Sequence, residues 1–363
     1  MDRAGRDAGS IAFAEQLLTV LAEGSFTATY KYAVILALVD LCLEYSTRSG
    51  AAPASVTTRQ LAEKVLAIYW PHARAFRTQV LRQNAGHQAG ILTLIARFQD
   101  HSEDESAPAA RARHLSPDLF ARLVRDVEWV LVKMPLPKLQ RVGREIVPVI
   151  YQINWGDDIR RGTFIAGDFD NLIRFVGDAG NHLLRLAPLL RPLVQREWSS
   201  MVARINDLPE AELDRFLFGA RRQTIAHLAV PLGELQHGKC FYCERPLGVG
   251  VEVDHFVPWS RHPDDGLDNL VAAHGRCNGQ KRDHLASAEH AEHWATRTLL
   301  HGGSLSAIAD AARWPREPER TIGVARSIYL GLHANARLWH DNDHFVTVDV
   351  DSPLLNQVFA TPA

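Results

Sequence analysis

The sequence predicts a mainly α-helical protein with one small α+β unit late in the chain. Apolar residues recur at helical spacing over much of the 363 residues, whereas runs rich in β-branched residues are short and few. Three of the four cysteines fall within 38 residues of one another, at 240–277. This clustering marks the late segment as a unit of its own.

The composition excludes several classes of protein. With 46% hydrophobic and 23% charged residues, the chain can bury the cores of two or three domains. Forty Lys and Arg against 42 Asp and Glu give a charge of −2, so global charge is no argument for binding nucleic acid or membranes. Four cysteines are too few for a disulfide scaffold. Lacking a signal-like start or an apolar run of bilayer length, the chain is expected in the cytoplasm, without a membrane partner.

Residues 1–105 are expected to form an N-terminal helical domain. Apolar spacing predicts helices within 11–21 and 32–42 and a third that opens at Thr57 and ends before Pro71. This order also fits a helix-turn-helix, but ordinary helix packing gives the same pattern, and no cluster of Arg, Asn and Gln marks a recognition helix.

Residues 106–225 are expected to form a mainly helical middle region. β-branched and aromatic runs at 146–151 and 162–166 suggest a short hairpin. Helical spacing returns over 181–205, where two prolines predict a break or a kink.

Residues 291–363 are expected to form a C-terminal helical region with a terminal strand. Helical spacing covers 287–300 and 323–338, and the alternating residues of 345–350 predict the strand.

Two ligand pairs of equal spacing predict a zinc site in the cysteine-rich unit. They are Cys240-x₂-Cys243 and His274-x₂-Cys277, which together offer four donors for a tetrahedral Zn²⁺ ion. The alternative is a set of unligated thiols, and His274 is the least specific member because the chain has 17 histidines. A closed four-ligand site has no open position for chemistry, so this zinc would be structural.

Residues with catalytic potential lie between and just after these pairs. Asp254 and His255 follow an alternating stretch that predicts a strand, and a carboxylate beside an imidazole suits metal-assisted hydrolysis of a phosphodiester. The dipeptide alone has little weight. Its significance depends on Asn269 and Asn278, which follow within the same zinc-bounded unit.

Residues 238–285 resemble the HNH nuclease domain, which has the ββα-metal fold. His255, Asn269 and Asn278 fill the three motif positions at intervals of 14 and 9 residues. The flanking Pro258 and the ending Cys-Asn-x-x-Lys at 277–281 also match members with a zinc knuckle. The resemblance covers about a seventh of the chain and places an HNH domain at 226–290, flanked by the helical regions.

The resemblance implies a role for each matched residue. His255 would be the general base, Asp254 and Asn278 would hold a catalytic Mg²⁺ or Mn²⁺, and Asn269 would hold the intervening loop. Structural zinc would be bound by Cys240, Cys243, His274 and Cys277. Many members have His where this chain has Asn278, and because an amide oxygen suits hard ions, little activity is expected with Zn²⁺ or Ni²⁺.

Three basic residues near the end of this motif are candidates for contacts with the nucleic-acid backbone. They are Arg276, Lys281 and Arg282, and a solvated helix end is the alternative for Arg282. Residues 237–285 contain six basic and seven acidic residues, so strong affinity for DNA would need another part of the chain, a second subunit or a partner protein.

The sequence thus predicts an endonuclease that hydrolyses DNA, with DNA as its partner. The arrangement of a long helical region before a zinc-knuckled HNH domain resembles bacterial restriction and anti-phage defence nucleases, some of which act with other defence components. Alternatives are an HNH nuclease of homing or repair type and an inactive zinc-knuckle module that only binds nucleic acid. A zinc hydrolase is disfavoured because all four zinc donors are used. One HNH site nicks one strand per encounter, so double-strand cleavage would need a homodimer or two visits.

Overall fold

The computed structural model divides the chain into two compact units. One unit holds Met1–Cys42 and Ala52–Ala220, and the other holds Leu43–Ala51 and Arg221–Ala363. The structure describes residues 3–23, 27–86, 90–102, 104, 107, 109–218, 225–333, 335–348 and 353–360. The domain boundary expected between residues 105 and 106 lies outside these described residues.

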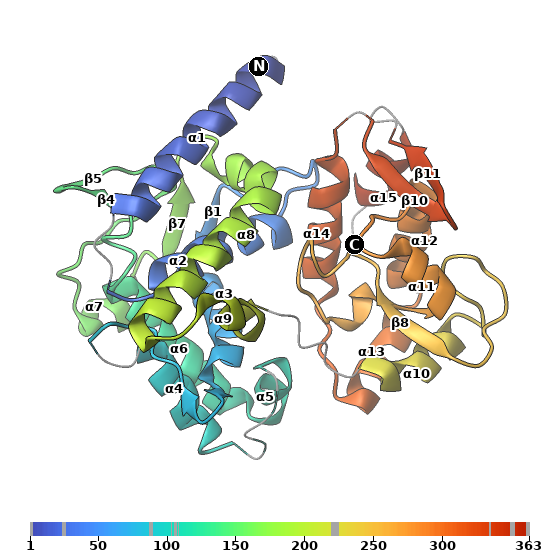
Figure 1. Ribbon diagram of the computed structural model, residues 1–363, viewed down its shortest axis with the longest axis horizontal. Coiled ribbons are helices and arrows are strands. Elements are labelled where there is room, and N and C mark those ends of the chain that lie inside the picture. Colours follow the sequence, from blue (N-terminus) through green and yellow to red (C-terminus); the bar gives the residue numbers. More distant parts are fainter. Residues whose placement is uncertain are drawn as a thin grey trace. The chain divides into compact units, whose positions relative to one another are not determined.

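The first unit is mainly helical (Figure 1). Its helical elements are α1 (Arg3–Glu23), α2 (Tyr30–Glu44), α3 (Thr58–Tyr69), η1 (Trp70–Ala73), α4 (Gly90–Gln99), α5 (Ala109–Leu115), α6 (Pro117–Lys133), α7 (Arg161–Ile165), α8 (Ala179–Asn206) and α9 (Glu210–Phe218). Almost every residue of α2 is buried, so this helix lies in the core. The ammonium of its Lys31 donates to the Leu21 carbonyl at 2.6 Å, which satisfies the buried charge locally.

The strands of the first unit are short. β1 (Ser55–Thr57), β7 (Leu172–Phe175) and β6 (Tyr151–Gln152) form an antiparallel sheet in the order β1-β7-β6. β2 (Ala75–Phe76) pairs with β3 (Gln79–Val80), and β4 (Arg141–Val142) pairs with β5 (Glu145–Ile146).

Local chemistry explains where α3 begins and why α8 continues through two prolines. Thr57 caps α3 in a capping box with Gln60, as the polar start predicts. Of the break or kink predicted in 181–205, the break is wrong, because α8 runs through both prolines as one helix. Pro188 and Pro192 lie four residues apart on its exposed face, where water can satisfy the carbonyls that lose their helical partner.

The strand predicted at 162–166 is also wrong, because these residues form the single-turn helix α7. Phe164 is buried and its ring lies 5.4 Å from the rings of both Trp129 and Phe169, measured between centroids. Packing of this aromatic residue outweighs the strand preference of its β-branched neighbours.

A buried polar network lies in the core of the first unit. Gln83 Oε1 accepts from Trp198 Nε1 at 2.6 Å and from Thr29 Oγ1 at 2.8 Å, while its Nε2 lies 3.2 Å from His72 Nδ1. His72 Nε2 lies 2.9 Å from the Leu217 carbonyl. Burial lowers the pKa of His72 to about 4, so the ring is neutral and can accept from Gln83.

The second unit contains a β-hairpin followed by a helix, and further helices surround them (Figure 1). Its helical elements are η2 (Ile225–Leu228), α10 (Ala229–Leu235), η3 (Leu267–Asn269), α11 (Gly275–Lys281), α12 (Ala288–Leu300), α13 (Gly302–Ala312), α14 (Pro318–Leu330) and α15 (Pro353–Ala360). Its strands are β8 (Val251–His255), β9 (Leu270–His274), β10 (Arg337–Asp341) and β11 (His344–Thr347).

β8 and β9 are antiparallel, and their register pairs Val251 with His274 and His255 with Leu270. α11 follows β9 directly, which gives the order ββα. An apolar core within the second unit joins the hairpin to the surrounding helices, with Leu228 and Leu232 packed beside Leu270 and Leu305. This core fixes the hairpin on which the candidate site is built.

The predicted C-terminal elements are corrected in part. α12 confirms the helix expected over 287–300, but 323–338 is not one helix. α14 ends at Leu330 with Gly331 as its cap, and Arg337 onwards pairs with β11 instead. Residues 349 and 350 of the predicted terminal strand lie outside the described part of the chain.

The mainly α class with a small α+β unit is confirmed. Among the helices formed by the described residues, none has both the length and the apolar character needed to cross a membrane.

Candidate active site

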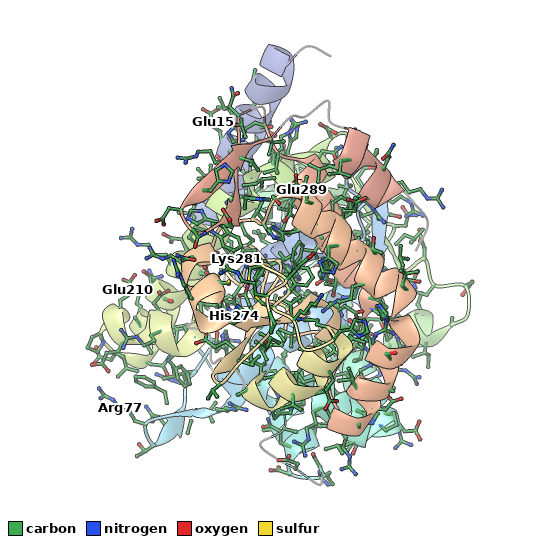
Figure 2. The ribbon with its side chains drawn as sticks, turned by 90° about the vertical axis from the view of Figure 1, so that its right-hand side faces the viewer. Glu15, Arg77, Glu210, His274, Lys281 and Glu289 are labelled. Atoms are coloured by element: carbon green, nitrogen blue, oxygen red, sulfur yellow. The ribbon has the colours of Figure 1, made fainter. Side chains whose placement is uncertain are left out.

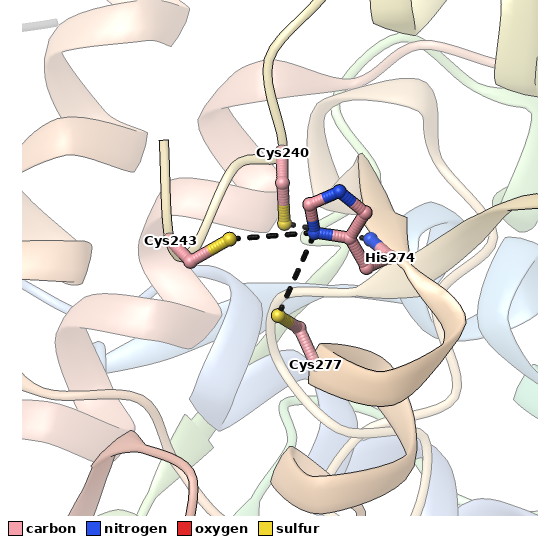
Figure 3. A group of neighbouring side chains, drawn as sticks. All are labelled: Cys240, Cys243, His274 and Cys277. Atoms are coloured by element: carbon pink, nitrogen blue, oxygen red, sulfur yellow. Dashed lines mark hydrogen bonds between the residues drawn. The ribbon is translucent and has the colours of Figure 1, made fainter. Parts of the chain in front are cut away.

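Four zinc-type donors meet at the start of α11 (Figure 3). Cys240 and Cys243 lie in the turn before β8, His274 ends β9, and Cys277 lies in the first turn of α11. The ligand atoms of all four residues lie within 4.8 Å of one another. The sequence spacing therefore becomes a compact cluster in space, of the composition that structural zinc sites have.

The orientation of His274 suits metal binding. Its Nδ1 lies 3.3 Å from the sulfur of Cys243 and 3.9 Å from that of Cys277. Its Nε2 lies 3.0 Å from the Pro246 carbonyl, so Nε2 carries the proton and Nδ1 is left with a lone pair toward the sulfurs. An outer hydrogen bond of this kind fixes the tautomer that a metal ligand needs.

The thiols also favour a cation at this position. Burial acts to raise the pKa of Cys243, but hydrogen bonds from the Arg245 amide and from neighbouring ligand side chains outweigh it, and the pKa falls to about 7. Burial and the negative charges of Cys240 and Cys243 raise the pKa of Cys277. A bound divalent cation relieves this repulsion, so the donor set fits Zn²⁺.

Two polar pairs connect β8 to α11. Glu252 and Asp254 lie two residues apart on one face of the strand, while Asn278 and Lys281 lie three residues apart on the helix. Asn278 Nδ2 donates to Glu252 Oε2 at 2.8 Å, and Lys281 Nζ lies 3.0 Å from Asp254 Oδ2. Asp254 and Asn278 therefore lie on facing elements, each belonging to a different one of two adjacent pairs.

One oxygen of Asp254 is engaged by protein groups. Its Oδ2 accepts from the hydroxyl of Tyr242 at 2.6 Å in addition to the Lys281 contact. Burial and the charge of Asp254 raise the pKa of Tyr242 well above its usual value, so the phenol keeps the proton that it donates. These contacts orient the carboxylate so that its other oxygen can serve a metal ion.

His255 is held by an acidic residue of the loop between β8 and η3. Its Nε2 lies 2.8 Å from Asp265 Oδ1, and its side chain is 9% exposed. The ring of Trp259 lies at 68° to the imidazole, with 5.4 Å between the ring centroids. A hydrogen bond and an aromatic neighbour thus restrict the orientation of the imidazole.

Asn269 ties the same loop together from a fully buried position. Its Oδ1 accepts from the Val257 amide at 2.8 Å, and its Nδ2 donates to the carbonyls of Val257 and Asp264 at 3.2 Å and 3.0 Å. The side chain therefore joins the start of the loop to its end.

The three basic candidates separate into two groups. Arg276 and Arg282 are exposed. Lys281 is fully buried, and its ammonium also donates to the His255 carbonyl at 2.8 Å (its position is labelled in Figure 2). The expectation that Lys281 contacts a nucleic-acid backbone is therefore corrected: this cation is used inside the protein, against Asp254.

Sequence reasoning did not identify Glu252, Tyr242 or Asp265. Strand alternation could have found Glu252, two residues before Asp254. Tyr242 lies between the first two zinc-type cysteines, where no pattern assigns it a role. Asp265 is ten residues from its partner His255 in an irregular loop, so no local period connects them.

Comparisons with known proteins agree with this geometry. The sequence model of the HNH endonuclease family matches residues 240–287, which contain the cysteine pairs, β8, β9 and α11. No solved structure matches the chain. A second family model, a domain of unknown function named DUF8808, matches residues 9–216, more than half of the chain. The chain belongs to this DUF8808 family, and after the DUF8808 region it carries an HNH endonuclease domain.

Proposed function

We propose that this protein is an endonuclease that hydrolyses DNA phosphodiester bonds with one Mg²⁺ or Mn²⁺ ion and His255 as the general base. The observation that carries the proposal is the arrangement around β8. Asp254 and Asn278, which both carry side-chain oxygens, lie on the facing elements β8 and α11, and the adjacent His255 is held by Asp265. Oxygen donors suit hard divalent ions, and the ordered imidazole suits proton abstraction from water.

Each residue has a definite task in this mechanism. His255 accepts a proton from the water that attacks phosphorus, and Asp265 keeps the imidazole turned toward that water. Asp254 and Asn278 hold the divalent ion, which when bound supplies positive charge to the scissile phosphate and the leaving 3′ oxygen. Asn269 keeps the loop closed, and the cluster of Cys240, Cys243, His274 and Cys277 holds structural zinc.

Contacts with DNA are assigned to exposed cations. Arg276 and Arg282 lie at the two ends of α11, outside the buried Asp254–Lys281 pair. Residues 237–285 carry six basic and seven acidic residues, so two arginines give this domain little affinity by charge alone. Other parts of the chain, a second copy or a partner protein would supply the rest.

Cleavage of plasmid DNA tests the proposal directly. Supercoiled, relaxed and single-stranded DNA are incubated at equal concentration with Mg²⁺ and wild-type protein, His255→Ala, or the control His333→Ala, which alters an exposed histidine outside the HNH match. Nicked circles should form before linear product, and His255→Ala should lose at least about 100-fold in rate while the control keeps its activity.

Two other outcomes would select the alternatives. Equal inactivity of the wild type and His255→Ala under all conditions would favour a zinc-knuckle module that binds nucleic acid without cutting it. Turnover supported by EDTA-resistant zinc alone would favour a zinc hydrolase.

We also propose bacterial restriction or anti-phage defence as the biological setting. The proposed arrangement has helical residues 1–105 and 106–225 before an HNH domain at 226–290, and a C-terminal region at 291–363, with the flanking regions setting specificity. The near-neutral charge supports recruitment by another component. Phage plating on cells that express the wild type or His255→Ala tests this setting, and equal plating would favour a homing or repair role.

A further inference from the structure

We propose that Asp265 is a positioning residue for the general base, and that residues 314–321, which lie outside the matched HNH segment, hold Asp265 in place. The proposal rests on the nuclease function above and deepens it. It assigns which nitrogen of His255 takes the proton, and it gives the connection between α13 and α14, together with the start of α14, a part in positioning the catalytic base.

The first step is the contact between the two side chains. His255 Nε2 lies 2.8 Å from Asp265 Oδ1, a distance typical of a strong N–H to carboxylate hydrogen bond. Their side chains are 9% and 14% exposed, so water competes little for either group. A carboxylate accepts hydrogen bonds, so the neutral ring carries its proton on Nε2.

The second step concerns the remaining nitrogen. Among the described residues, His255 Nδ1 has no hydrogen-bond partner. With Nε2 occupied by Asp265, Nδ1 has a free lone pair, and it is the only ring atom that can accept a proton from water. Asp265 therefore selects the reactive tautomer, in the manner of the carboxylate in a Ser-His-Asp triad.

The third step is the support of Asp265 itself. Trp314 Nε1 donates to the Asp265 carbonyl at 2.7 Å, and the Leu267 amide donates to the Pro315 carbonyl at 3.0 Å. Thr321 Oγ1 donates to Asp264 Oδ2 at 2.8 Å. Three bonds from 314–321 thus fix the loop on both sides of Asp265, in addition to the Asn269 tie.

A double-mutant cycle tests the proposal. Asp265→Asn keeps the shape of the side chain but removes its charge, and the amide can offer either an acceptor oxygen or a donor NH₂ group to Nε2. We therefore expect kcat to fall at least about tenfold while KM and Mn²⁺ binding change by less than about twofold. In the His255→Ala background the same substitution should cost nothing further, because it acts only through the imidazole. Asp310→Asn, on the exposed side of α13, is the matched control.

A second substitution and a second measurement complete the test. Trp314→Phe should lower kcat in the wild type and not in His255→Ala. In ¹⁵N-histidine-labelled protein, the His255 signal, assigned by its loss in His255→Ala, should show a protonated Nε2 that becomes a mixture of tautomers in Asp265→Asn.

Two results would overturn the proposal. They are equal losses from Asp265→Asn in both backgrounds, and an unchanged tautomer signal in Asp265→Asn. If the wild type cuts no DNA, the proposed nuclease function fails, and the tautomer signal still reports separately on the Asp265 contact.

Discussion

The ammonium of Lys281 lies 3.0 Å from Oδ2 of Asp254, and the lysine side chain is fully buried. The pair joins α11 to β8, and its Asp254 is one of the two residues proposed to hold the catalytic ion. A buried ion pair adds little net stability over an apolar pair, because both charges lose their hydration. Its value here is geometric, since it fixes the carboxylate of Asp254 relative to the helix that carries Asn278.

Replacing Lys281 by Met should destabilise the protein strongly. The substitution leaves the Asp254 carboxylate buried without a counter-charge, which typically costs about 3–5 kcal/mol. Arg282→Met, one residue later and exposed, should change stability by less than about 0.5 kcal/mol. Denaturant unfolding measures both variants. If the Lys281→Met protein were stable and had lost only its affinity for DNA, the result would instead support the first expectation, that Lys281 contacts the nucleic-acid backbone.

The cluster of four zinc-type donors and the strand β8 could be predicted from the sequence because both depend on short-range spacing, whereas the order ββα was implied by the resemblance to HNH domains. Cys240-x₂-Cys243 and His274-x₂-Cys277 each place two donors in one turn, and alternation around Val253 marks a strand. The partner of His255 could not be predicted in this way. Asp265 is held by Trp314, 49 residues later, and only tertiary packing brings them together.

The same reason explains the errors outside the site. The β-branched residues beside Phe164 favour a strand, but the burial of its ring against Trp129 stabilises α7. Lys281 lies three residues after Asn278 on one helix face, and the sequence leaves open whether that face contacts DNA or packs on β8. In the structure Lys281 packs against β8, where Asp254 is its counter-charge.

Asn278→His should broaden the metal preference of cleavage. The proposed wild-type site offers a carboxylate oxygen and an amide oxygen, so Mg²⁺ and Mn²⁺ should support activity and Ni²⁺ should support little. An imidazole at position 278 should raise the Ni²⁺ rate relative to the Mg²⁺ rate by at least about tenfold. The measurement is the nicking rate across a metal series, with His333→Ala as the control. An unchanged ratio would remove Asn278 from the metal site.

His72 should make the first unit less stable in acid. Burial lowers its folded pKa to about 4 from an ordinary value of 6.5, so the unfolded chain binds this proton first. The contribution of neutral His72 to the free energy of unfolding is therefore fully present above pH 6.5. It is lost as the pH falls toward 4, and the total loss is about 3 kcal/mol. Denaturant midpoints between these pH values should vary less in His72→Gln than in wild type. His114→Gln, an exposed histidine, should leave the pH dependence unchanged.

Removing one zinc-type donor should release the metal and loosen the nuclease domain. Cys277→Ser breaks the set of donor atoms that lie within 4.8 Å of one another, and because metal binding contributes to folding, the thermal midpoint should fall by several degrees. Cys42→Ala is the matched control, since Cys42 is a buried thiol outside the cluster. Elemental analysis should find about one zinc per chain in the wild type and in the control, and little in Cys277→Ser. A Cys277→Ser protein that retained both its zinc and its thermal midpoint would show that Cys277 is not a ligand of a structural metal ion.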